Sequence, residues 1–232
     1  MKLRVLPDAE SVARHGAAFI ADAARAAVKE RGAFLFAASG GRTPWVMFRA
    51  LGEEALPWGA VHVFQVDERA APAGDPDRNL AHLRRSLLAK APLPPDNLHA
   101  MPVEEDDLTA AAAAYARGLE ALAGSPPRLD LVHLGLGPDG HTASLAPGDP
   151  VLAMDDAPVA VAGPYQGRRR LTLTYPVLDR ARGILFIVTG EEKADALGKL
   201  LAHDLSIPAG RVRPKDAVVM ADRAAAAGLG HG

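Results

Sequence analysis

The residues best suited to catalysis are Asp139 and His141, which lie in a short segment after a run of apolar residues. The run extends from Leu129 to Leu136 and has the length and composition of a strand that is buried on both faces. Gly137 and Pro138 end it with a sharp turn. Open α/β sheets form their ligand crevices just beyond the carboxyl ends of such strands. A histidine beside an aspartate at that place predicts a general base with an orienting partner, although an isolated Asp-Gly-His is more often a surface turn.

Residues 39–44, with the sequence Ser-Gly-Gly-Arg-Thr-Pro, join a predicted strand to the start of a predicted helix. Free backbone N–H groups and the positive end of the helix dipole favour a bound anion there. The segment lacks the Gly-Lys-Ser/Thr core of a P-loop and the GxGxxG of dinucleotide-binding folds, so an anion site and a simple tight turn both remain open. We predict that Thr43 is the N-cap of the helix and that Pro44 lies in its first turn. The candidate ligand-binding residues are Ser39, Gly40, Gly41, Arg42 and Thr43.

Charged residues at three other places are suited to an anionic ligand. Asp67 and Arg69 follow a predicted strand, where arginine matches a phosphate or carboxylate and aspartate matches a sugar hydroxyl. Arg170 belongs to a run of three arginines that is prominent in a chain of net charge −2. Lys193 lies at the start of a predicted helix, where the helix dipole disfavours a cation unless an anion is bound. For each of these residues a solvated surface position is the alternative.

Predicted strands and helices alternate along the chain, which indicates an α/β fold with a doubly wound, mainly parallel sheet and helices on both faces. Strands are expected at residues 2–6, 33–38, 61–66, 98–101, 129–136, 159–161, 170–175, 183–189 and 218–220, and helices at 9–31, 44–51, 79–88, 108–122 and 193–201. No repeat or linker divides the chain, so residues 1–232 are predicted to form a single domain, with a small subsidiary lobe around residues 150–169. Residues 163–170 are predicted to be a polar loop.

The composition excludes several classes of partner and site. The chain has 232 residues, with 26 Lys+Arg against 28 Asp+Glu, and this balance argues against a nucleic-acid or membrane surface. It has no cysteine, and its histidines show no metal-ligand spacing, so we expect neither a disulfide nor a metal site. No run approaches the ~18 apolar residues of a membrane span and no signal region is visible, so the cytoplasm is the expected location. His231 lies in the C-terminal tail.

Four separated strings resemble the pattern of the 6-phosphogluconolactonase family. They are SGGRTP at 39–44, DER with a later Asn at 67–79, GLGPDGHTASLAPG at 135–148, and RLTLT at 170–174 followed by GEEK at 190–193. The resemblance implies a fold like that of the glucosamine-6-phosphate deaminases and ribose-5-phosphate isomerases. It also implies hydrolysis of 6-phospho-D-glucono-1,5-lactone to 6-phosphogluconate in the pentose phosphate pathway, without metal or cofactor. The implied ligand is a small sugar phosphate lactone, and the protein is expected to be a monomer or a small homo-oligomer.

Residue chemistry and resemblance together predict the roles in the site. His141 is the predicted general base, and either Asp139 or a backbone group fixes its tautomer. Either Arg69 or backbone N–H groups stabilise the oxyanion. The phosphate is predicted to lie among Gly40, Gly41, Arg42, Arg170 and Lys193.

The chain departs from the family pattern in two places. Many members have Phe where this chain has Ala146, and many have a loop like Ser-Pro-Lys-Pro-Pro where this chain has Gly-Pro-Tyr-Gln-Gly at 163–167. The deaminases, which the chain resembles less closely, continue after the histidine with Ile-Ala-Phe-Asn-Glu-Pro-Gly, and their Glu falls at Ala146. The resemblance implies that, in the deaminases, the carboxylate of this glutamate supports the histidine. A deaminase or isomerase and a sugar-phosphate-sensing domain remain the alternatives, because a fold does not select a function.

Overall fold

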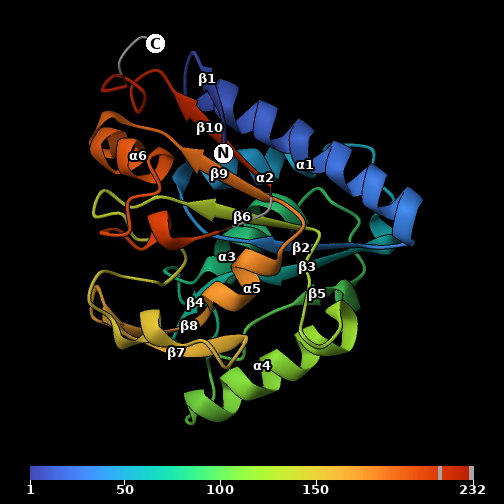
Figure 1. The fold of residues 1–232 in the computed structure, drawn as a ribbon. Coiled ribbons are helices and arrows are strands. Elements are labelled where there is room, and N and C mark those ends of the chain that lie inside the picture. Colours follow the sequence, from blue (N-terminus) through green and yellow to red (C-terminus); the bar gives the residue numbers. More distant parts are fainter. Residues whose placement is uncertain (214–215, 230–232) are drawn as a thin grey trace.

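Seven strands form one parallel sheet in the computed structural model of the chain, which describes residues 1–213 and 216–229 (Figure 1). From edge to edge they are β1 (Lys2–Leu6), β10 (Ala217–Asp222), β9 (Ile184–Val188), β6 (Leu131–Gly135), β2 (Phe34–Ala38), β3 (Val61–Gln65) and β5 (Leu98–His99). Every neighbouring pair is parallel. This confirms the predicted doubly wound, mainly parallel sheet. His231 lies outside the described residues.

Helices cover both faces of the sheet, as predicted. They are α1 (Ala9–Arg31), α2 (Arg42–Leu51), α3 (Asn79–Leu83), a π-helical turn (Arg84–Leu88), α4 (Leu108–Ala123), α5 (Tyr175–Arg180) and α6 (Ala194–Leu201). Short 3₁₀ turns lie at Trp58–Ala60, Pro95–Asn97, Pro150–Ala153, Glu191–Lys193 and Ala209–Arg211. One apolar core joins α1 and α2 to the sheet, and a second joins α4, α5 and α6 to its other face. In Figure 1, α1 and α4 accordingly lie on opposite sides of the sheet.

A second, antiparallel sheet of three strands accounts for the predicted subsidiary lobe. Its strands, in order, are β4 (Asp67–Arg69), β8 (Arg168–Leu173) and β7 (Val159–Tyr165). The prediction of a polar loop at 163–170 is wrong, because these residues end one strand, turn and begin the next. Gln166 and Gly167 have φ values of 54 and 77°, the left-handed conformation of a tight two-residue hairpin turn. Residues 67–69, expected to follow a strand, form a strand of their own.

The order of the strands places a crevice between β2 and β6. From β2 the chain proceeds through β3 to β5 at one edge, then returns to β6 on the other side of β2 and continues to β9 and β10. Ligands of open α/β sheets bind at such a reversal, outside the carboxyl ends of the strands. In Figure 1 the arrowheads of β6, β9 and β10 point to the same side. Both segments with candidate chemistry, 39–44 and 137–142, start at this edge.

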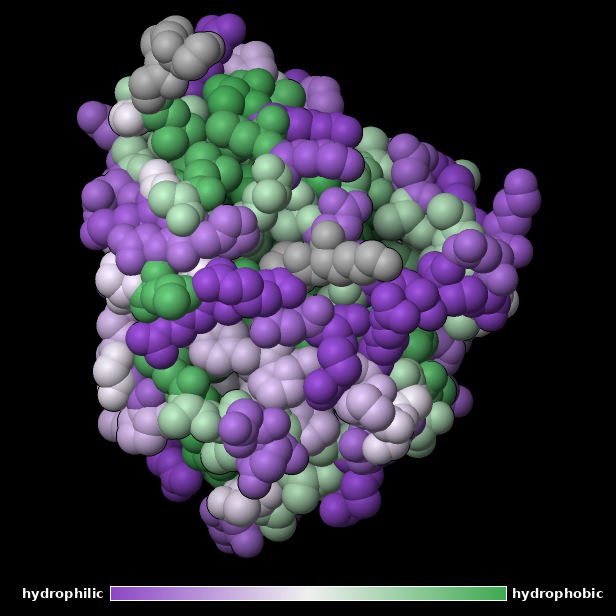
Figure 2. Space-filling model, viewed as in Figure 1, coloured by the Kyte–Doolittle hydropathy of each residue, from purple (hydrophilic) through white to green (hydrophobic). Residues whose placement is uncertain are grey.

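Among the described residues, no helix is both long enough and apolar enough to cross a bilayer. Figure 2 shows hydrophilic side chains over most of the visible face, with apolar side chains gathered mainly near its top.

Candidate functional site

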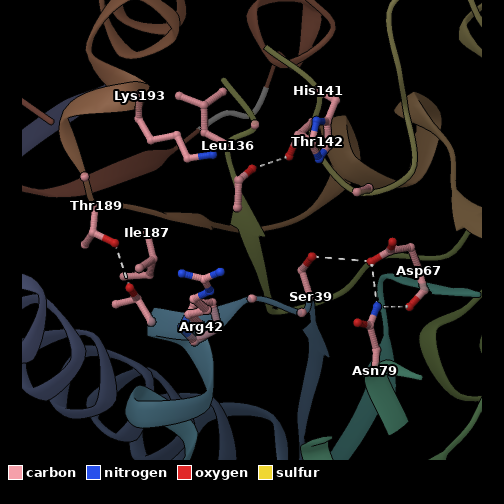
Figure 3. A pocket seen from close by; sticks show the side chains of 18 of the residues that line it. Ser39, Arg42, Asp67, Asn79, Leu136, His141, Thr142, Ile187, Thr189 and Lys193 are labelled. Carbon is pink, nitrogen blue, oxygen red and sulfur yellow. Dashed lines mark hydrogen bonds between the residues drawn. The ribbon is translucent and has the colours of Figure 1, made fainter. Parts of the chain in front are cut away.

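A cavity of about 650 Å³ opens at the carboxyl edge of the sheet and collects the residues that the sequence singled out (Figure 3). Ten of the eleven candidate residues line it: Ser39, Gly40, Gly41, Arg42, Thr43, Asp67, Arg69, His141, Arg170 and Lys193. The eleventh, Asp139, is hydrogen-bonded to the imidazole ring of His141. Residues from five different segments thus meet in one space, although their roles there remain predictions.

Asp139 holds His141 by two hydrogen bonds. Its Oδ1 lies 2.6 Å from Nδ1 of the imidazole and accepts the backbone N–H of His141 at 3.1 Å. Partial burial raises the pKa of Asp139, but the hydrogen bonds from His141 outweigh it, and the net pKa lies below the ordinary value. An ionised carboxylate has no proton to give, so the hydrogen in this bond belongs to Nδ1. The imidazole is therefore oriented with Nε2 free to accept a proton.

The turn that carries His141 is fixed by its own backbone. The N–H of Gly137 donates to the carbonyl of His141 at 2.8 Å, and the Thr142 hydroxyl donates to the carbonyl of Gly135 at 2.8 Å. A Cβ at Gly137 would collide with the His141 ring and with the Asp139 carboxylate. Position 137 must therefore be glycine for this pair to pack against the backbone.

The segment 39–44 forms the opposite wall, and one detail of it differs from the prediction. The N-cap of α2 is Gly41, with no side-chain cap, so the prediction of Thr43 as the N-cap is wrong. Thr43 lies within the first turn instead, and its hydroxyl is 2.6 Å from that of Thr189, which follows β9. Because its hydroxyl is engaged in this long-range hydrogen bond, Thr43 does not cap the helix. The first turn of α2 has no side-chain cap, and Gly41, Arg42 and Thr43 line the cavity, so the start of this helix is placed where an anion could bind.

His133 supports this wall from beneath. It is fully buried on β6, and its Nδ1 accepts the backbone N–H of Ser39 at 3.3 Å. Burial lowers its pKa from 6.5 to about 3, so the ring is neutral in the folded protein. His133 was not predicted as a site residue. The one signal was its position as a polar residue inside an otherwise apolar strand.

We expect His133→Asn to reduce the loss of stability in acid. The unfolded chain takes up a proton at position 133 below about pH 6.5 and the folded chain does not, so stability present at neutral pH is lost as pH falls. Between pH 7 and pH 5 this one group lowers the free energy of unfolding by about 2 kcal/mol. Asparagine can still accept the Ser39 N–H but does not titrate. Urea unfolding of both proteins at the two pH values measures the difference, and an equal loss in both would contradict the assignment.

Asp67 and Arg170 form a buried charged pair at the floor of the cavity. Arg170 Nη1 lies 3.9 Å from Asp67 Oδ2, and each residue is 4% exposed. Asp67 also accepts the Ser144 hydroxyl at 2.7 Å and the Ser39 hydroxyl at 3.4 Å. Burial lowers the pKa of Arg170 and Asp67 opposes that effect, but an arginine stays charged. Asp67 thus orients its neighbours, and because it also lines the cavity, its role toward a sugar hydroxyl stays a prediction.

Arg69 and Lys193 add positive charge on two further sides. Arg69 Nη1 donates to Asn79 Oδ1 at 2.9 Å and to the Asp77 carbonyl at 2.8 Å, so no carboxylate neutralises it in these bonds. Burial lowers the pKa of the Lys193 amine, although Glu192 and Asp139 oppose the shift. Figure 3 shows Lys193 and Arg42 reaching into the cavity from different elements. A dianionic ligand would be attracted to this space.

Several residues of the cavity were not predicted as site residues. Asn79, Tyr165, Gln166, Thr189 and Asp222 belong to them. Thr189 and Asp222 follow or end strands at the same edge, which is a signal that sequence reasoning could have used. Tyr165 and Gln166 reach the cavity only because β7 and β8 form a hairpin over it. Among the described residues, no group of three or more His, Asp or Glu is placed to hold a metal ion.

Comparisons with known proteins by sequence and by structure find the same group of enzymes. A family model described as glucosamine-6-phosphate isomerases/6-phosphogluconolactonase matches residues 7–221. A 6-phosphogluconolactonase from Synechocystis sp. is 39% identical over 200 residues, covering 83% of each chain. The crystal structure of a 6-phosphogluconolactonase from Thermotoga maritima is 28% identical, with a TM-score of 0.86 over 95% of this chain and 99% of that one. A monomeric glucosamine-6-phosphate deaminase is 22% identical with a TM-score of 0.84, over 98% of this chain and 100% of that one, so that likeness concerns the fold alone.

Proposed function

The chain belongs to the glucosamine-6-phosphate isomerase/6-phosphogluconolactonase family, and we propose that it hydrolyses 6-phospho-D-glucono-1,5-lactone to 6-phosphogluconate, the lactone step of the pentose phosphate pathway. The observation that carries this proposal is the His141 imidazole, held at Nδ1 by Asp139 and facing a cation-rich cavity. The 6-phosphogluconolactonase names of its relatives support the choice of substrate.

In the proposed reaction His141 activates a water molecule. A lactone is an activated ester, so water can attack it without a covalent intermediate on the protein. Nε2 of His141 accepts a proton from water as the water oxygen bonds to the carbonyl carbon. The Asp139 carboxylate stabilises the imidazolium that forms, since it lies 2.6 Å from the other ring nitrogen. When the tetrahedral adduct collapses, the same imidazolium returns the proton to the ring oxygen.

The developing oxyanion needs a donor on the side of the cavity away from the water. Arg69 is one candidate, because it lines the cavity and its bonds to Asn79 and to the Asp77 carbonyl hold it in place. Backbone N–H groups of the cavity wall are the other candidate. A fixed donor at this position contributes about 10²–10³-fold to acyl transfer in other enzymes.

The phosphate is proposed to bind between the start of α2 and the cations around it. Arg42 and Lys193 reach the cavity from α2 and from the turn before α6, and Arg170 lies on its floor. The burial that lowers the pKa of Lys193 also keeps water from its amine, which strengthens the attraction to an anion. These contacts would position the lactone carbonyl relative to His141.

The direct test is a lactonase assay with freshly prepared 6-phosphogluconolactone. Because this substrate opens unaided, the rate without protein must be subtracted at each pH. Release of acid above that background, in proportion to protein concentration, is expected. A rate equal to the background would refute the proposed function and favour a sensing domain, which binds a sugar phosphate without turning it over.

We expect Arg170→Ala to weaken binding of 6-phosphogluconate selectively. Loss of a hydrogen-bonded charge to the phosphate should raise the Kd by about 10- to 100-fold, while binding of gluconate, which lacks the phosphate, should change little. Calorimetry with the two ligands measures the difference. The matched control is Arg168→Ala, because Arg168 is already paired with Asp75 at 3.1 Å and Asp77 at 3.3 Å. Equal affinities of the wild-type protein for the two ligands would contradict the phosphate assignment.

A further inference from the structure

Tyr165 lies at the end of β7, where the hairpin β7–β8 folds over the cavity. Ala162 pairs with Arg170, but Tyr165 pairs with Arg168, so β7 contains one extra residue between the two pairs. A bulge of this kind re-aims the side chains that follow it. Without it, Pro164 would share a face with Ala162 and Arg170. With it, Tyr165 takes that face and points toward the site.

The hydroxyl of Tyr165 reaches the pair formed by Asp139 and His141. It lies 3.3 Å from Asp139 Oδ2 and 3.3 Å from His141 Nδ1. The centroids of the Tyr165 and His141 rings are 5.0 Å apart. Nδ1 already donates its hydrogen to Asp139 Oδ1, so it has no lone pair to accept a second one. The hydroxyl therefore donates to Oδ2. Each carboxylate oxygen then has its own donor, Oδ1 from His141 and Oδ2 from Tyr165.

We propose that Tyr165 is a positioning residue for His141, acting through the Asp139 carboxylate. The proposal rests on the proposed function, which makes His141 the general base. With both oxygens bonded, the carboxylate cannot rotate away from the imidazole. The bond to Tyr165 also draws charge away from the carboxylate and so moderates how strongly Asp139 stabilises the imidazolium.

The ring of Tyr165 has a separate contact. The guanidinium carbon of Arg170 lies 5.2 Å from the ring centroid, within the range of a cation–π interaction. Phenylalanine would keep this contact and lose the hydroxyl, whereas alanine would lose both. The two substitutions therefore separate the effect on the imidazole from the effect on the phosphate ligand.

The other ionisable groups near the pair are Lys193 and Arg170. Asp139 opposes the lowering of the Lys193 pKa, and Arg170 opposes the raising of the Tyr165 pKa that burial and Asp139 cause. Neither cation is hydrogen-bonded to the Asp139 carboxylate among the described residues. A substitution that removes only the Tyr165 hydroxyl leaves both cations in place.

The test compares Tyr165→Phe and Tyr165→Ala with Arg169→Ala, which alters an exposed residue of the same hairpin that does not line the cavity. Tyr165→Phe should lower kcat about three- to tenfold with little change in KM. It should also shift the acid limb of the pH–rate profile to higher pH, because the carboxylate without its donor stabilises the imidazolium more. Tyr165→Ala should raise KM as well, and Arg169→Ala should behave as wild type.

An NMR titration of the His141 ring, assigned by its absence from His141→Ala, needs no substrate. Its midpoint should be higher in Tyr165→Phe than in the wild-type protein. Equal midpoints would overturn the positioning role, whether or not the lactone is hydrolysed. Tyr165→Phe could also keep the wild-type kcat and pH profile while His141→Ala is inactive. That result would refute the positioning role of Tyr165 and leave the proposed function supported. A wild-type rate no higher than the spontaneous one would refute the proposed function instead, and the titration would still decide on Tyr165.

Discussion

His141→Ala should lower the rate of lactone opening by about 10²–10⁴-fold while the protein stays folded. The side chain is only partly buried and lies at the wall of the cavity, so its removal leaves no hole in either apolar core. The substitution removes the nitrogen that we propose accepts the proton of the attacking water. The rate is measured with fresh lactone after subtraction of the spontaneous reaction, and the melting temperature reports the fold.

The matched control is His15→Ala, which removes an exposed histidine of α1 whose Nδ1 is hydrogen-bonded to the carbonyl of Ser11 and which does not line the cavity. It should keep the wild-type rate. A folded His141→Ala protein with a near-normal rate would place the base elsewhere. Asp67 would be the next candidate by position, but its carboxylate already accepts two hydroxyl groups and lies near Arg170.

Features that depend on neighbours in the chain could be predicted from the sequence. Asp8 and Gly32 mark the ends of α1 as expected, since Asp8 accepts the Ser11 N–H at 2.7 Å and Gly32 has a φ of 83°. The apolar run before Gly137 is a buried strand, and the turn after it presents His141. These signals are local, because capping and periodicity are set within a few residues.

Features that depend on distant partners could not be predicted. Residues 163–170 are rich in turn formers, and only pairing with residues 67–69, about a hundred positions earlier, makes β8 a central strand. Thr43 has the residue type of an N-cap, but its hydroxyl is hydrogen-bonded to that of Thr189, 146 positions later. The support of Ser39 by His133 spans 94 positions. In each case tertiary contacts override a local preference, and at this site they decide which side chains face the ligand.

The second large effect concerns the choice between lactone hydrolysis and deamination, which the fold cannot make, because the family includes both kinds of enzyme. The Asp-Gly-His turn is common to both as well. The difference lies at Ala146, a buried residue in the turn that follows Ser144. The deaminase pattern has a glutamate there, and the methyl group of alanine can neither accept a hydrogen bond nor stabilise an imidazolium. In this chain His141 is hydrogen-bonded to Asp139 instead, and the Asp139 carboxylate also accepts the Tyr165 hydroxyl.

Glucosamine 6-phosphate should therefore release almost no ammonia at protein concentrations that open the lactone quickly. Opening of an aminosugar ring needs sustained proton transfer to the ring oxygen, for which the deaminase glutamate supports the histidine. The lactone ring needs less help, since collapse of the tetrahedral adduct itself expels the ring oxygen. Ammonia is measured by a coupled assay over the same range of protein concentration, with a glucosamine-6-phosphate deaminase as the positive control. If ammonia release kept pace with lactone hydrolysis, Ala146 would not discriminate between the two reactions, and the deaminase alternative would replace the lactonase as the principal activity.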